Sequence, residues 1–225
     1  MKKLYIISTV AVAVLLHSCS KDIKERNLEF RALQPASLDI NAGIWKPILL
    51  TGPTEFPVPS PGATTTPDYI AQVNEIKSFQ ADITTAEKNS VKYWSAGAIL
   101  RWNEIMRELV ALHNLPPYQN PDGTYPFPSA NNPLAYPQFP FANPPYAARA
   151  YAYVAAAQYD ALVAAWHYKK LYARAAPYTV DATVNAMIPK SDLPSYPSED
   201  AVVIGVTTEL LKLLFPTWAV VVVVP

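Results

Sequence analysis

The chain has 225 residues, which is enough for one medium-sized helical domain or for one domain with a long arm. Hydrophobic residues make up 51% of it and charged residues 16%, so it can bury a core and is too apolar for a disordered chain. The formal net charge is zero and no basic stripe is present, so the composition gives no indication of a nucleic-acid partner.

Residues 1–18 have the pattern of a bacterial lipoprotein signal peptide. Met1-Lys-Lys3 is basic, and the apolar stretch from Leu4 to Leu16 is too short for a comfortable transmembrane helix. Cys19 follows this stretch after two residues, His17 and Ser18, and is the only cysteine, which excludes an internal disulfide. We expect Cys19 to be acylated and to anchor the mature chain to a membrane of the bacterial cell envelope, facing the periplasm or the outside. The alternative is an ordinary secretory signal with an unmodified cysteine.

Residues 19–65 contain few periodic apolar positions and several helix breakers, namely Pro53, Pro57, Pro59, Pro61 and Gly62. This composition predicts an irregular arm that lifts the domain off the membrane surface. Within it, residues 44–50 form a short strand-like stretch. Across the whole chain, 23 prolines against 6 glycines indicate helices joined by stiff connections rather than by hairpins.

Two helix starts follow the arm. Thr66-Pro67-Asp68 combines an N-cap threonine, a proline at the first helical position and an acid in the first turn. Thr84 and Glu87 form a capping-box pattern that opens a second helix. Its apolar positions keep helical spacing, so we expect one long helix that continues through Leu112 and ends before the next prolines.

The second helix carries a group of acids that permits two interpretations. Glu104 and Glu108 are four residues apart and share a face, with His113 beyond them, which is a spacing that carboxylate metal sites use. The alternative is plain salt bridges, because Arg101 and Arg107 lie within helical reach of both acids. The absence of a Glu-x-x-His pair favours the salt bridges.

Residues 115–145 contain ten prolines together with six aromatic residues, among them Tyr125 and Phe127. Such a segment forms neither a helix nor a central strand. Its aromatic content predicts an ordered loop wrapped over the helices, where it covers a site. The alternative is a low-complexity linker.

Pro144 opens a third long helix, which is rich in alanine and which we expect to be the central helix of a bundle. Asp160 is a lone acid in this apolar stretch, and we favour a hydrogen-bonded structural group over a catalytic one. The segment from His167 to Arg174 is basic, which suits the C-terminal end of a helix.

A connection from Pro177 to Pro194 leads to a fourth helix. Ser198 stands where an N-cap belongs, with two acids directly after it at the positive end of the helix. The apolar run from Ala201 to Leu214 forms the helix, which stops at Pro216. Together the four helices predict an all-α bundle with a long proline-rich loop.

Trp166, Lys169 and Pro177, followed by the segment Pro194-Ser-Tyr-Pro-Ser198, resemble the type-2 phosphatidic acid phosphatase and vanadium-dependent haloperoxidase superfamily. The closest likeness is to lipoprotein members from Bacteroidetes-type bacteria, and it covers roughly residues 66–217. The resemblance implies a helical bundle that hydrolyses phosphoesters or oxidises halides with bound vanadate.

The resemblance also implies which residues hold the phosphate or vanadate, namely Lys169, Arg174 and Ser198. Arg174 stands two residues before the family position, which is Ala176 here, and Lys170 is an alternative cation. Asp200 occupies the position of the family's general acid/base histidine and is a weak catalytic candidate.

Three features of the chain depart from the family pattern. Glu199 replaces a glycine beside the anion, where its carboxylate would repel the ligand. The late histidine that acts as nucleophile or vanadium ligand has no counterpart, since the histidines are His17, His113 and His167. We therefore expect this chain to be inactive, with an incomplete domain over residues 66–217 and a valine-rich tail at 218–225 that is typical of a truncated or frame-shifted end.

Two other classes of function compete with this interpretation. One is a non-catalytic helical surface lipoprotein that binds a glycan or another ligand through its aromatic, proline-rich loop. The other is a simple anchor or scaffold subunit, although no coiled-coil repeat supports it.

Overall fold

The computed structural model describes residues 30–32, 41–113, 120–124 and 144–216. Every regular element in these ranges is a helix, so the predicted all-α class is confirmed. The elements are the 3-10 helix η1 (Ala42–Ile44) and the α-helices α2 (Pro67–Ala81), α3 (Thr85–Trp94), α4 (Ala98–Leu112), α5 (Pro144–Tyr172), α6 (Pro177–Val180) and α7 (Glu199–Leu214). The signal peptide with Cys19, most of the 115–145 loop including Tyr125 and Phe127, and the 218–225 tail lie outside the described residues.

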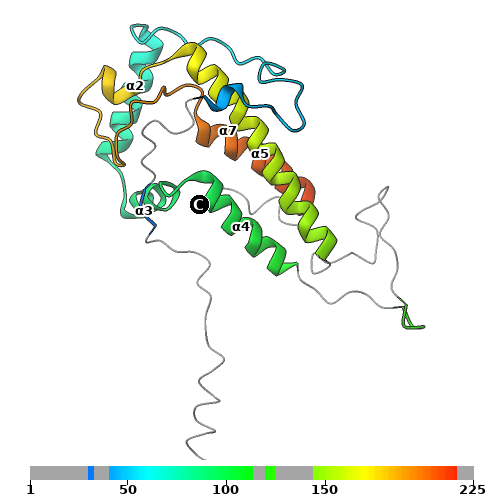
Figure 1. Cartoon of the computed structure of the whole chain (residues 1–225). Coiled ribbons are helices and arrows are strands. Elements are labelled where there is room, and N and C mark those ends of the chain that lie inside the picture. The colour runs from blue at the N-terminus through cyan, green and yellow to red at the C-terminus, as the bar shows by residue number, and fades with distance from the viewer. Residues whose placement is uncertain (1–29, 33–40, 114–119, 125–143, 217–225) are drawn as a thin grey trace, which may run out of the picture.

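Helices α4, α5 and α7 build the main core. Helix α5 lies alongside α7 for most of the length of α7, and α4 runs in roughly the same direction and contacts both of them (Figure 1). The buried side chains of this core are Ala98, Trp102, Met106, Leu109, Val154, Val203, Leu211 and Phe215. One buried polar pair joins the two long helices, since the Gln158 amide donates to the Thr207 hydroxyl over 2.8 Å. The central position predicted for the alanine-rich helix is confirmed.

The helix starts that the sequence predicted carry the expected caps. The Thr66 hydroxyl accepts from the amide of Tyr69 at the start of α2. At the start of α3, Thr84 and Glu87 form both bonds of the capping box. The Ser198 hydroxyl accepts from the amide of Ala201, so α7 begins at Glu199, two residues earlier than predicted. These caps satisfy amides that the helices themselves cannot pair.

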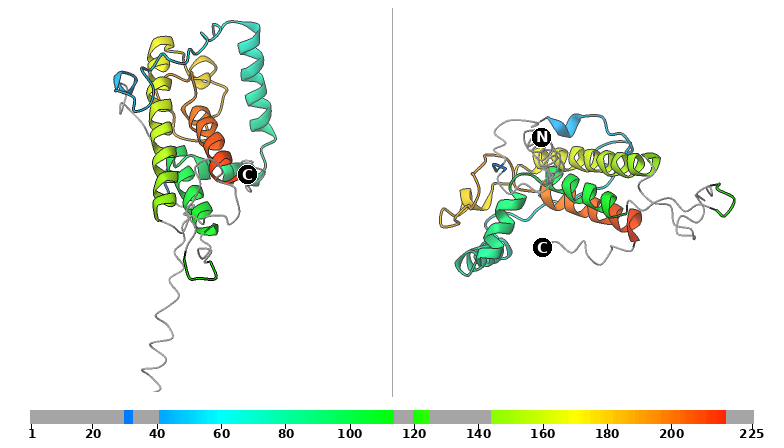
Figure 2. Two further views of the ribbon diagram at one scale, coloured as in Figure 1. Left: turned by 90° about the vertical axis from the view of Figure 1, so that its right-hand side faces the viewer. Right: turned by 90° about the horizontal axis from the view of Figure 1, so that it is seen from below.

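The single long helix predicted between residues 84 and 112 is wrong, because the chain bends sharply between α3 and α4. Gly97 has φ 107° and ψ 132°, a conformation that side chains with a Cβ strongly disfavour. Helices α3 and α4 therefore run in different directions from this bend, which we call the α3–α4 elbow, as Figure 2 shows. The sequence pattern does not indicate this break, because apolar residues keep helical spacing on both sides of Gly97.

Residues 41–58 of the arm pack on α5 and contain no strand, so the predicted strand-like piece at 44–50 is wrong. A Cβ added to Gly43 would lie 2.4 Å from the backbone nitrogen of His167, which means that η1 touches the backbone of α5 directly. Further along, the Tyr159 and Tyr172 hydroxyls donate to the carbonyls of Lys46 and Val58. The right-hand view of Figure 2 shows this segment lying along α5.

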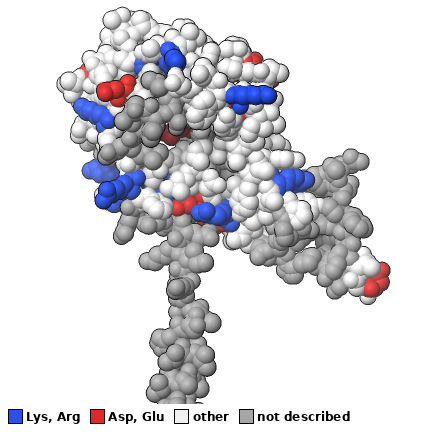
Figure 3. All heavy atoms as spheres, viewed as in Figure 1, with Lys and Arg blue, Asp and Glu red and all other residues white. Residues whose placement is uncertain are grey.

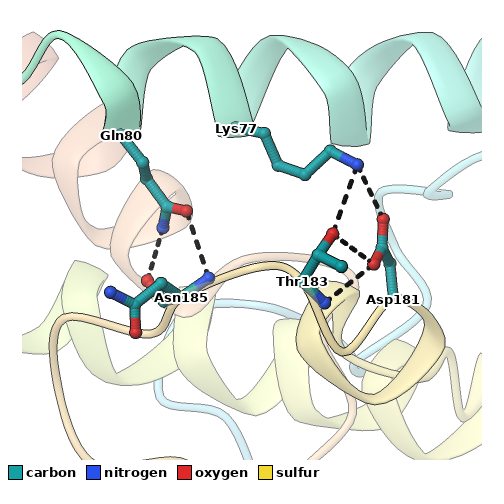
Figure 4. Close-up of polar contacts among 5 residues, drawn as sticks. All are labelled: Lys77, Gln80, Asp181, Thr183 and Asn185. Atoms are coloured by element: carbon teal, nitrogen blue, oxygen red, sulfur yellow. Dashed lines mark hydrogen bonds and ion pairs between the residues drawn. The ribbon is translucent and has the colours of Figure 1, made fainter.

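Helix α2 is attached through a small satellite cluster rather than through the main core. Tyr69 and Val73 of α2 bury against Val184, in the loop that follows α6. Polar contacts extend this attachment, as Figure 4 shows: the Lys77 ammonium lies 2.9 Å from the Asp181 carboxylate, and the Gln80 side chain pairs with the backbone of Asn185.

Charges of both signs are scattered over the face of the molecule drawn in Figure 3, with no extended patch of one sign. This agrees with the formal net charge of zero. Among the described helices, none combines the length and the apolar character that crossing a membrane requires.

Candidate functional site

The candidate site lies where the C-terminal end of α5 meets the N-terminal end of α7. Lys169, in the last turn of α5, is 4% exposed. Its ammonium donates to the Pro194 carbonyl over 2.5 Å and lies 3.7 Å from the Glu199 carboxylate. It also lies 5.5 Å from the ring centroid of Trp166, one turn earlier on α5. The lysine is therefore surrounded by a carbonyl, a carboxylate and an aromatic face.

The segment before α7 is held in place by the end of α5. The Ser195 amide donates to the Arg174 carbonyl over 2.8 Å, and the Ser195 hydroxyl donates to the Ala175 carbonyl over 3.0 Å. This attachment sets the Pro194 carbonyl against Lys169. Because Ser198 then caps α7, the acids Glu199 and Asp200 follow in its first turn, beside the same lysine.

The three charges perturb one another. Burial lowers the pKa of Lys169, and the charge of Glu199 opposes this shift. Burial also raises the pKa of Glu199; the charge of Lys169 and a hydrogen bond from the Trp166 side chain act against that rise. The pKa of Asp200 is raised by loss of surrounding water, with Lys169 again acting in the opposite direction. Ionising these groups is therefore costly, and each charge depends on its neighbours.

The other residues assigned to oxyanion binding lie differently. The Arg174 guanidinium lies over two aromatic rings, 4.7 Å from the centroid of Tyr69 and 5.8 Å from that of Tyr196. The Lys170 ammonium donates to the Asn41 side chain over 3.2 Å, next to η1. Ser198 is exposed and uses its hydroxyl as a helix cap. Of the predicted binding residues, Lys169 and Ser198 thus come together at one helix start.

The residues present do not fit a phosphate or vanadate ion as they stand. An oxyanion needs donors that are free to reach it, and the buried Lys169 already faces a carboxylate of its own chain. Asp200 adds a second negative charge at the same place. The acids stand where the resemblance implies a glycine and a histidine, so the site is closed by its own side chains.

Glu104 on α4 forms a buried salt bridge. Arg101 and Glu104 are both fully buried and lie 2.8 Å apart. The guanidinium also donates to the Tyr93 carbonyl across the α3–α4 elbow. Within the part of the chain that the structure describes, no three His, Cys, Asp or Glu side chains gather as metal ligands would.

Sequence reasoning missed two members of the site and misjudged a third. The Pro194 carbonyl and the Trp166 indole contact Lys169 or its partner, whereas the sequence pattern includes both residues in the resemblance and assigns neither of them to the site. Glu199 was interpreted as a group that repels a ligand, whereas it is the ion-pair partner of Lys169. Glu199 is an acid in the first turn of α7, and an acid there is expected to have a cation nearby. That expectation could have predicted its pairing with Lys169.

Comparisons with known proteins provide no relative for the chain. No family model matches it, and neither the curated proteins nor the solved structures include a similar one.

Proposed function

We propose that the chain is an envelope lipoprotein, anchored through Cys19, that descends from the acid phosphatase and vanadium haloperoxidase superfamily. Its oxyanion site is closed by Glu199, and these 225 residues do not run the family's chemistry. They hold a helical domain at the membrane surface of the cell envelope.

The ion pair between Lys169 and Glu199 carries this proposal. A buried ammonium is costly unless an anion neutralises it. The resemblance implies that phosphate or vanadate plays this part in the superfamily, where a lysine and a serine hydroxyl help to hold the oxyanion. Here a carboxylate of the same chain takes the place of the ligand, while the lysine and the serine keep their positions.

A single substitution tests the closure. Glu199→Gln removes the internal anion and leaves Lys169 buried without its partner, so we expect the variant to gain affinity for vanadate and phosphate. The measurement is isothermal titration of both ions into the full chain, together with the rise in melting temperature at saturating ion. The wild-type chain should show neither heat nor stabilisation.

Glu209→Gln is the matched control, since it removes the same charge from an exposed position on the same helix, where Glu209 pairs with Lys212. It should bind no better than the wild type. The double variant Lys169→Met/Glu199→Gln should lose the gained affinity. If Glu199→Gln does not bind either ion, or if the wild type hydrolyses an aryl phosphate and Ser198→Ala abolishes that turnover, the proposal is wrong.

A further inference from the structure

The arm segment of residues 44–56 exposes an unusual number of large apolar side chains. Trp45 is 45% exposed, and four aliphatic or aromatic side chains are between 63% and 75% exposed, namely Ile44, Ile48, Leu49 and Phe56. A segment of this length would normally turn such residues toward the core. Exposed apolar groups gathered in this way mark an interaction surface.

Polar contacts hold the backbone of residues 48–50, and the side chains of Ile48 and Leu49 remain exposed. The amides of Ile48, Leu49 and Leu50 all donate to the Asp160 carboxylate, over 2.6, 2.6 and 2.9 Å. Because the amides turn inward to α5, the side chains of Ile48 and Leu49 stay on the outside.

Two further contacts order the rest of the segment, one with α5 and one within the segment itself. The Trp45 ring stacks on Tyr159, and the Glu55 carboxylate accepts from both the amide and the hydroxyl of Thr51. The apolar groups are therefore presented on an ordered backbone, and binding through them needs little further ordering of the chain.

We propose that residues 44–56 dock on the surface of the lipid bilayer that carries the anchor. The proposal rests on the anchoring of Cys19 in the proposed function. Residues 20–43 join Cys19 to Ile44 at the start of the segment, so the segment begins within about 90 Å of the anchored residue even if that connection is fully extended.

The side chains have the chemistry of the membrane interface. Trp45 combines an apolar ring with an indole N–H, the amphipathic character that favours the headgroup level. Ile44, Ile48, Leu49 and Phe56 supply apolar area for the acyl boundary. Lys46, which is exposed between them, can reach anionic headgroups.

Single labels test where the segment lies. The mature lipoprotein, isolated from membranes, is reconstituted in vesicles of phosphatidylcholine and phosphatidylglycerol, with an environment-sensitive fluorophore on Leu49→Cys. Leu213→Cys on α7 is the matched control, because the two leucines are 71% and 78% exposed. We expect the emission of the Leu49 label to shift to shorter wavelength on reconstitution and that of the Leu213 label to stay unchanged.

Quenching of tryptophan fluorescence by brominated lipids is a second measurement, made on an unlabelled chain. Wild-type tryptophan emission should fall in such vesicles, and Trp45→Phe should lose most of that quenching. A Leu49 label that stays in water, with no quenching of Trp45, overturns the proposal. Protection of Leu49 in native membranes but not in pure lipid would also overturn it, in favour of a protein partner.

Mass spectrometry shows whether the chain carries acyl groups. The acylation and the position of the Leu49 label therefore test the anchor and the docking surface separately. A chain without acyl groups whose Leu49 label still enters lipid keeps the docking surface and contradicts the anchor. An acylated chain whose Leu49 label stays in water keeps the anchor and contradicts the docking surface.

Discussion

Asp160 links two parts of the chain that are more than a hundred residues apart. Burial acts to raise the pKa of its carboxyl. Hydrogen bonds from the amides of Ile48, Leu50 and Leu49 lower this pKa by more than burial raises it, so it lies below its ordinary value. The group is therefore ionised in the folded protein and fixes the arm to α5. This is the structural role that the sequence favoured for a lone acid on an apolar helix.

Asp160→Asn should lower the free energy of unfolding by roughly 3 kcal/mol at neutral pH, because three partly buried amides lose an ionised acceptor. A carboxyl whose pKa is lowered on folding stabilises above its unfolded pKa of about 3.9, and this contribution is lost as the pH falls through the folded value. Urea unfolding at pH 7 and pH 3 measures the difference between wild type and variant, which should shrink in acid. Asp192→Asn, at an exposed acid, is the control; a difference that does not change with pH would contradict the role of the charge.

At the scale of elements, the elbow between α3 and α4 sets the direction from which α4 enters the core. The amide of Gly97 donates to the Trp94 carbonyl, and the Gly97 carbonyl accepts from the amide of Arg101. The residue thus ends one helix and begins the next while holding a backbone conformation that suits glycine. The buried Arg101–Glu104 pair lies in the first turns after this elbow.

Gly97→Ala should destabilise the protein by about 1–3 kcal/mol, since alanine at positive φ is strained. Gly205→Ala is an informative counterpart, because Gly205 lies inside α7 and an added Cβ meets nothing within 4 Å. That change should stabilise by about 0.5–1 kcal/mol through helix propensity. Thermal and denaturant unfolding measure both; equal effects of the two substitutions would mean that backbone strain does not govern the elbow.

At the scale of the whole molecule, the described chain has one main core and one loosely attached helix. Helices α4, α5 and α7 share the main core, whereas α2 relies on a satellite cluster and on polar contacts with the loop after α6. The Thr183 hydroxyl and Lys77 lower the pKa of Asp181 to about 2. These contacts are partly exposed, and partly exposed ion pairs stabilise little.

Helix α2 should therefore open locally without unfolding of the rest. Lys77→Ala/Gln80→Ala should speed amide exchange in residues 67–81 and 178–185, with a local loss of roughly 1 kcal/mol, and should leave α5 and α7 unchanged. Hydrogen exchange followed by mass spectrometry reads this out. Lys88→Ala, an exposed lysine on α3, should have no such effect; a uniform increase across all helices would show that α2 belongs to the main cooperative unit.

Most helix starts could be predicted because their signals are local. Thr66, Thr84 with Glu87, and Ser198 each act on amides within three residues, so the neighbouring sequence contains the whole interaction. The break at Gly97 could not be predicted in the same way. Apolar spacing continues across it, and a glycine inside a periodic stretch is compatible with both a helix and a bend.

The candidate site was predicted in part. Lys169 and Ser198 were named from the resemblance; Lys169 forms an ion pair with Glu199, the residue that follows Ser198, and the Ser198 hydroxyl caps α7. Arg174 was named with them, yet its guanidinium lies over Tyr69 and Tyr196, because α2 and the segment before α7 offer it aromatic faces. Such a choice depends on which surfaces the fold brings together.

The sequence by itself determined the all-α class, the capped helix starts and the identity of the lone buried acid on α5, because these follow from periodicity and from contacts between near neighbours. Only the tertiary structure decided that the arm lies on α5 through Asp160 and that Glu199 closes the space beside Lys169. These contacts join residues 30 to 112 positions apart. Their partners are selected by the packing of α5 against η1 and α7, which no short stretch of sequence encodes.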